Sequence, residues 1–113
     1  MAHAISTHVL DTERGKPARD VPVTLARKDG DRFVALVSDR TNEDGRIADL
    51  VGGPLEAGTY QLTFDVAAYF RQQGRDAPFL TRFVVEFQIS DTQRHYHVPL
   101  LLSPYSGTTY RGS

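Results

Sequence analysis

The sequence contains no cysteine and no tryptophan among its 113 residues. The absence of cysteine excludes a disulfide framework and thiol chemistry, and it suits a reducing compartment. No apolar run approaches the roughly 20 residues that a membrane-spanning helix needs. The opening MAHAISTHVLD has no basic segment followed by an apolar one, so we predict no secretory signal and a cytoplasmic protein.

A surplus of charge of one sign is also missing. The chain has 13 Lys and Arg residues against 14 Asp and Glu residues, a net charge of −1, and no block of basic residues. Because nucleic acids and anionic membranes attract clustered positive charge, neither is an expected partner. With 40% hydrophobic residues in 113, the chain suits a single domain over residues 1–113 with a modest core.

What the sequence does contain is a series of short segments in which apolar and polar residues alternate. Alternation with a period of two is typical of β-strands that bury one face. It is clear in residues 5–10, 21–27, 33–39, 59–64 and 83–89, and weaker in residues 46–50, 95–101 and 108–110. Asp29-Gly30 predicts a hairpin turn, whereas residues 11–18 are predicted to form a loop.

One short helix is predicted between these strands. Asp65 can cap its start, Gly74 can close its end, and Val66, Tyr69 and Phe70 share one helical side between them. About eight short strands with turns between them and a single helix predict a mainly β fold, a two-sheet β-sandwich.

Histidines stand out on two of the predicted strands. If residues 95–101 are extended, His95 and His97 point to one face while Tyr96 and Val98 point to the other, which leaves a polar face free for chemistry. Two histidines at this spacing with no set of carboxylates or thiolates are not a zinc signature. Judged alone, His8 and His97 are more often structural than catalytic, and we expect His3 to be solvated.

Four motifs, in this order along the chain, resemble the transthyretin-like family, and within it the 5-hydroxyisourate hydrolase branch. They are STHVLD at residues 6–11, Gly45-Arg46, HYHVPLLLSP at residues 95–104, and YRGS at residues 110–113. The YRGS ending is the most specific of them, because it separates the hydrolase branch from the hormone carrier. Gly107 departs from the family pattern, where a bulkier residue, often Tyr, is expected.

The resemblance implies a transthyretin-like (prealbumin-like) sandwich assembled as a homotetramer, a dimer of dimers with sites at the subunit interface. The implied reaction is the hydrolytic opening of the six-membered ring of 5-hydroxyisourate to 2-oxo-4-hydroxy-4-carboxy-5-ureidoimidazoline, in the degradation of urate to allantoin. It implies no metal and no organic cofactor.

The resemblance also implies the residues of the site, provided that the first strand and the last two lie side by side. The implied catalytic residues are His8, Arg46 and His97, and the implied substrate-binding residues are His8, Arg46, Tyr110, Arg111, Gly112 and Ser113. Imidazole suits proton transfer near neutral pH, so we favour His97 as the main base with His8 as its partner. The planar, charged fork of Arg46 suits carbonyl oxygens or an anionic ring.

Two other functions stay open at this stage. One is a transthyretin-like carrier of small hydrophobic ligands, and the other is a structural sandwich of the carboxypeptidase regulatory-like kind, whose middle segments have similar turns and alternations. Likewise, Arg46 after Asp44-Gly45 is compatible with a simple turn-flanking charge. The two ends of the chain discriminate, because a structural module needs no such histidines and a carrier needs an apolar channel.

Overall fold

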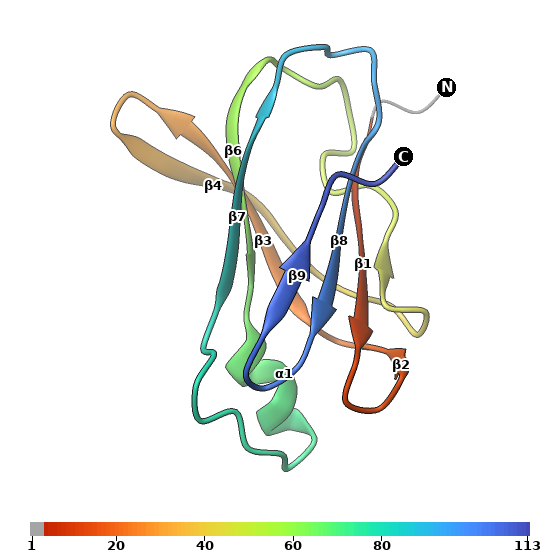
Figure 1. Cartoon of the computed structure of the whole chain (residues 1–113). Helices are drawn as coiled ribbons and strands as arrows, with labels where there is room; N and C mark the ends of the chain where they lie inside the picture. The colour runs from red at the N-terminus through yellow and green to blue at the C-terminus, as the bar shows by residue number, and fades with distance from the viewer. Residues whose placement is uncertain (1–3) are drawn as a thin grey trace.

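Two β-sheets packed face to face make up the computed structural model, which describes residues 4–113 (Figure 1); His3 lies outside the described residues. The first sheet has the order β2-β1-β8-β9, with β5 also paired to β1, and the second has the order β4-β3-β6-β7. The strands of the first sheet are β1 (Ile5–Asp11), β2 (Lys16–Pro17), β5 (Arg46–Ile47), β8 (Tyr96–Leu102) and β9 (Gly107–Thr109). Those of the second are β3 (Pro22–Asp29), β4 (Arg32–Arg40), β6 (Gly58–Phe64) and β7 (Phe83–Ile89). The predicted mainly β sandwich with one short helix is confirmed.

The core lies between the sheets and is built from the apolar positions of each alternating segment. Val9 of β1, Leu25 of β3 and Leu62 of β6 are fully buried there. The helix α1 (Val66–Gln72) covers one end of the sandwich, with Tyr69 and Phe70 among its buried residues. As predicted, the Asp65 side chain caps α1, accepting a hydrogen bond from the Ala68 amide at 3.0 Å.

Several strand boundaries differ from the sequence prediction, most clearly at β2 and β5. The predicted loop 11–18 contains the two-residue strand β2, so the described chain has nine strands rather than about eight. A tight turn at Gly15, whose φ is 69°, returns the chain so that Pro17 lies opposite Leu10. The predicted strand 46–50 is shorter, ending at Ile47, and the last strand begins at Gly107 rather than at residue 108.

Gly107, the departure from the family pattern, has a packing explanation. A Cβ atom built on Gly107 would lie only 2.7 Å from Cε1 of Phe83, which stands across the sandwich on β7. The Phe83 ring therefore fills the space that a larger side chain on β9 would need, and a bulky residue at position 107 requires a smaller one at position 83.

A parallel pairing between β1 and β8 determines where the two ends of the chain meet. In Figure 1 the red β1 and the blue β8 run side by side, and their register places Ser6 opposite His97 and His8 opposite Pro99. β5 pairs antiparallel with the other edge of β1, so that Arg46 lies opposite His8. Residues from three distant parts of the chain therefore share one sheet surface.

A buried carboxylate ties the far end of β1 to the helix. Asp11 is 0% exposed, and it accepts hydrogen bonds from Tyr69 Oη at 2.8 Å and from Arg75 Nη1 at 2.7 Å. Arg75 also pairs with Glu13, and its guanidinium lies over the Phe70 ring. Burial alone would raise the pKa of Asp11, but the hydrogen bonds from Arg75, Tyr69 and the Arg14 amide outweigh it and lower this pKa.

Replacing Asp11 by Asn is expected to lower the free energy of unfolding by about 3 kcal/mol, because Arg75 loses its buried partner. Urea unfolding followed by circular dichroism measures the difference. The matched control is Asp49→Asn, since exposed Asp49 also accepts two backbone hydrogen bonds in a turn. The control is expected to change stability by no more than about 0.5 kcal/mol.

The pH dependence of the stability difference between wild type and Asp11→Asn tests whether the Asp11 charge causes it. The folded pKa of Asp11 lies below the unfolded value of about 3.9, so the carboxylate's contribution is fully present above that pH. It is lost as the pH falls through the folded pKa, and the gap between wild type and Asp11→Asn then narrows. A difference in free energy of unfolding that stays constant down to about pH 2 would contradict the electrostatic explanation.

Candidate active site

The outer face of the first sheet carries the polar residues of β1 and β8. Because Ser6 lies opposite His97 in a parallel pair, both side chains project to the same face, which His8 shares two residues further along β1. The neighbours of His97 in the chain, Tyr96 and Val98, are buried between the sheets, whereas His97 itself is half-buried. The predicted alternation of residues 95–101 is therefore confirmed.

A cavity of about 460 Å³ lies at this face. It is lined by Ser6, Thr7, Arg46, Ile47, Ala48, His95, His97 and Ser113. Of the predicted site residues, the structure thus brings Arg46, His97 and Ser113 together around one cavity. His8 stands opposite Arg46 in the register of β1 and β5.

A tight turn positions Arg46 beside β1. The Asn42 side-chain oxygen accepts hydrogen bonds from the amides of Asp44 and Arg46, at 2.9 and 3.0 Å. Gly45 has a φ of 75°, and a Cβ atom there would lie 2.4 Å from the Val9 carbonyl oxygen. Only glycine permits this close approach. The turn therefore holds β5 against β1 and presents the guanidinium next to the histidines.

The Ser6 hydroxyl contacts both histidines of the cavity. Its Oγ atom lies 2.6 Å from His95 Nε2 and 2.7 Å from His97 Nδ1. Sequence reasoning missed Ser6, and it placed His95 only on the same strand face as His97. The signal available was weak: Ser6 stands two residues before His8, on the same strand face.

Two other imidazoles and a guanidinium surround His97 and affect its protonation. Burial lowers the pKa of His97, and repulsion from His95, His8 and Arg46 lowers it further. The imidazole is therefore neutral near pH 7 and can accept a proton.

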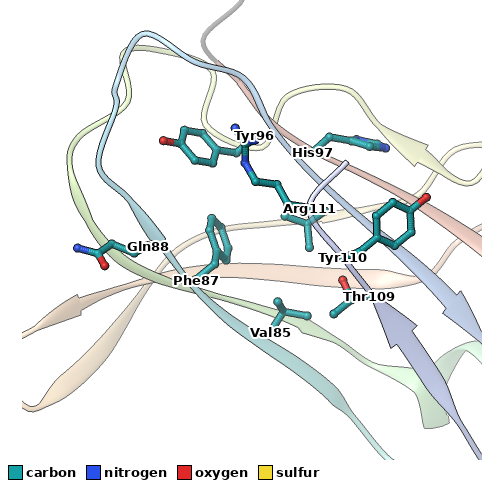
Figure 2. Close-up of a pocket in the computed structure, with 9 residues that line it drawn as sticks. Val85, Phe87, Gln88, Tyr96, His97, Thr109, Tyr110 and Arg111 are labelled. Atoms are coloured by element: carbon teal, nitrogen blue, oxygen red, sulfur yellow. The ribbon is translucent and has the colours of Figure 1, made fainter. Parts of the chain in front are cut away.

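The last four residues, 110–113, lie on two sides of His97: Ser113 on one side, and Tyr110 and Arg111 on the other. The Gly112 amide donates a hydrogen bond to the His97 carbonyl at 2.8 Å, which draws Ser113 to the cavity. Tyr110 and Arg111 instead line a second pocket of about 220 Å³ together with His97 and residues of β7. Figure 2 shows the Arg111 side chain extending toward Tyr96, whose ring centroid lies 5.1 Å from the guanidinium carbon, while the His97 imidazole extends to the other side. Within one chain, Arg111 therefore lies outside the polar cavity.

The described residues, 4–113, contain neither a metal-binding cluster nor a membrane-spanning helix. No group of three or more His, Cys, Asp or Glu residues within that range is arranged to hold a metal ion. No helix in the same range has the length and apolar character needed to cross a membrane.

The family model described as HIUase/Transthyretin family matches residues 5–112. A 5-hydroxyisourate hydrolase of Deinococcus radiodurans is 50% identical over 113 residues, covering 96% of this chain and 95% of the relative. This chain belongs to the HIUase/Transthyretin family. The resemblance inferred from the four sequence motifs is thereby confirmed.

Solved structures of the HIUase/Transthyretin family share the fold. The 5-hydroxyisourate hydrolase of Klebsiella pneumoniae superposes with a TM-score of 0.84 at 42% identity, over 96% of this chain and 98% of that one. Transthyretin from Sparus aurata superposes with a TM-score of 0.88 at 31% identity, over 98% and 97% of the two chains. The predicted transthyretin-like sandwich is confirmed, and the fold alone does not separate the two functions.

Substituting Gly112 by Ala is expected to displace the His97 ring, because the added Cβ atom would lie 2.5 Å from His97 Cδ2. The imidazole resonances of His97 in NMR spectra should therefore shift. The control is Gly53→Ala, where a Cβ atom would meet nothing within 4 Å. Unchanged His97 resonances in the Gly112 variant would show that the ending does not set the ring position.

Proposed function

We propose that this chain hydrolyses 5-hydroxyisourate, opening its six-membered ring to give 2-oxo-4-hydroxy-4-carboxy-5-ureidoimidazoline in the degradation of urate to allantoin. The observation that carries the proposal is 50% identity, over nearly the whole chain, to a 5-hydroxyisourate hydrolase. Identity to transthyretin from Sparus aurata is lower, at 31%. A cavity lined by imidazoles and a guanidinium also suits a polar, reactive substrate better than the hydrophobic ligand of a carrier.

The hydrolysis of a cyclic amide requires an activated water, a donor for the developing oxyanion and a proton for the leaving nitrogen. His97, whose pKa is lowered by burial and by its cationic neighbours, is the proposed base that removes the water's proton. Arg46 donates to the oxygen that becomes negative, and as a permanent cation it needs no proton uptake to do so. His8, opposite Arg46, is the proposed donor to the leaving nitrogen.

The remaining predicted residues contribute to substrate binding in this proposal. The hydrogen bond from the Gly112 amide to the His97 carbonyl holds Ser113 at one side of the cavity. Figure 2 shows Tyr110 extending to the same side as His97, and its side chain is 58% exposed. Tyr110 and Arg111 are therefore available to a substrate held between subunits.

We also propose that the chain assembles as a homotetramer, a dimer of dimers with sites at the interface. β7 and β9 are the last strands on the same side of their sheets, and their open edges can pair with those of a second copy. Exposed Leu101 and Tyr110 give apolar surface for association. A cytoplasmic location is proposed with it, in keeping with the lack of cysteine.

Freshly prepared 5-hydroxyisourate, made by oxidising urate, is expected to lose its ultraviolet absorbance much faster with the protein than without it. The spontaneous decay in the same buffer is the baseline, and heat-denatured protein is the control. Decay at the spontaneous rate with folded protein would end the hydrolase proposal and leave the carrier as the alternative.

Variants in the same assay separate the proposed roles. His97→Asn is expected to reduce turnover by about 10²–10⁴-fold, the usual effect of losing a general base. Arg46→Ala is expected to raise the barrier by about 2.7–4 kcal/mol through loss of the oxyanion donor. Arg40→Ala is the matched control, because Arg40 is exposed on β4 of the other sheet. Full activity in His97→Asn would remove His97 from the mechanism.

Dilution to the monomer is expected to abolish activity, because each site needs groups from a neighbouring subunit. Sedimentation velocity defines the concentration at which the tetramer dissociates, and activity is measured across that range with inert carrier protein present. A sedimenting monomer with full specific activity would contradict the shared-site arrangement.

A further inference from the structure

We propose that Ser6 is a positioning residue that fixes the tautomer of His97 and conducts a proton from His97 to His95. The inference rests on the proposed hydrolase function, in which His97 takes the proton from water. Its basis is the Ser6 hydroxyl, with Oγ 2.7 Å from His97 Nδ1 and 2.6 Å from His95 Nε2.

The backbone holds the hydroxyl in place between the two rings. Ser6 is the register partner of His97 across the β1–β8 pair, and its residue is only 6% exposed. The Tyr96 amide donates to the Ala4 carbonyl at 2.8 Å, which ties the segment between the histidines to the start of β1. With a single side-chain torsion, Ser6 needs little further ordering to hold this geometry.

The number of hydrogens limits how Ser6, His97 and His95 can be hydrogen-bonded to one another. A hydroxyl carries one proton and two lone pairs, so it can donate to only one of the two ring nitrogens. At least one of His97 Nδ1 and His95 Nε2 must therefore carry hydrogen. In the arrangement that leaves His97 active, Nδ1–H donates to Ser6 and the Ser6 hydroxyl donates to His95. Nε2 of His97 is then left with a free lone pair to act as the base.

The same arrangement provides a route for the proton after the water is activated. When His97 Nε2 takes a proton from water, the ring becomes a cation with hydrogen on both nitrogens. Its Nδ1–H proton passes to Ser6 Oγ while the Ser6 hydroxyl proton passes to His95 Nε2. One N–H and one O–H bond break and one of each forms, so the serine is unchanged and the charge moves to His95.

The surroundings favour movement in that direction. The groups facing the His97 ring are His8 on β1, Arg46 on β5 and His95 before β8, and of these Arg46 is a permanent cation. His97 is half-buried whereas His95 is exposed, so a proton on His95 can leave to solvent. Burial and repulsion from Arg46 both disfavour the cation on His97.

The contrast with Thr7 argues against a purely structural role for Ser6. Thr7 Oγ1 donates to the Val98 carbonyl at 2.6 Å, a link between the strands on the buried side that stabilises the sheet. The Ser6 hydroxyl makes no such link to the main chain among the described residues and contacts two imidazoles instead. Its removal should therefore affect the histidines more than the fold.

The first test uses the unmodified protein and does not depend on turnover. Long-range ¹⁵N–¹H correlation spectra at about pH 7.5–8 are expected to place the hydrogen of neutral His97 on Nδ1. In Ser6→Ala the Nδ1–H population should fall. A wild-type His97 protonated on Nε2 would overturn the proposal, even if the protein proves to be an active hydrolase.

The second test compares kinetics across three variants. Ser6→Ala is expected to reduce kcat about 10- to 100-fold, less than loss of the base itself, with little change in KM. The acidic limb of its pH–rate profile should move to lower pH, because the hydroxyl no longer accepts a bond from the His97 cation. Ser6→Thr keeps a hydroxyl and should retain the wild-type tautomer and profile. Ser38→Ala, which removes an exposed hydroxyl from the other sheet, is the control.

A double variant tests the conduction step. If Ser6 acts through His95, adding His95→Gln to Ser6→Ala should cost little further activity, although His95→Gln alone is damaging. Fully additive losses would overturn the link to His95. Ser6→Ala with wild-type kcat and an unshifted pH profile would overturn the role of Ser6 altogether. If wild type fails to hydrolyse the substrate, the hydrolase proposal fails, while the tautomer measurement still decides the arrangement at Ser6.

Discussion

The parallel pairing of β1 with β8 is the constraint on which the candidate site depends. It joins a strand near the start of the described chain to one near its end, and it aligns Ser6 with His97 on one face while Val9 and Leu100 pack on the other. The side-chain period of a strand is two, so a slip of one residue would turn His97 into the core and Tyr96 out to the cavity. The buried apolar residues of both strands make that register the stable one.

The pairing also separates stability from chemistry. Inward residues of β1 and β8 supply the packing, and Asp11 with Tyr69 and Arg75 fastens the end of β1 to the helix. The outward residues of β1 and β8 do not take part in core packing. Polar groups and the Arg46 cation can therefore lie together on the outer face of the sheet. Burial and this cluster together lower the pKa of His97.

Much of this arrangement could be predicted from the sequence. Local alternation located the long strands, and Asp65 and Gly74 bounded the helix, because these signals act over a few residues. The two-residue β2 was missed since it has no pattern of its own and exists only as a partner of Leu10 and Asp11. For the site, family motifs indicated His8, Arg46 and His97. Ser6 was not recognised, because its contact with two histidines depends on a pairing between residues some ninety positions apart.

That separation has a consequence for how the protein becomes functional. Contacts between residues so far apart in sequence carry a large loop-closure entropy, and topologies rich in them fold slowly. During synthesis β1 leaves the ribosome long before β8 exists, so the edge of β1 stays unpaired on that side until β8 has been made. The candidate site can therefore assemble only after β8 has been synthesised.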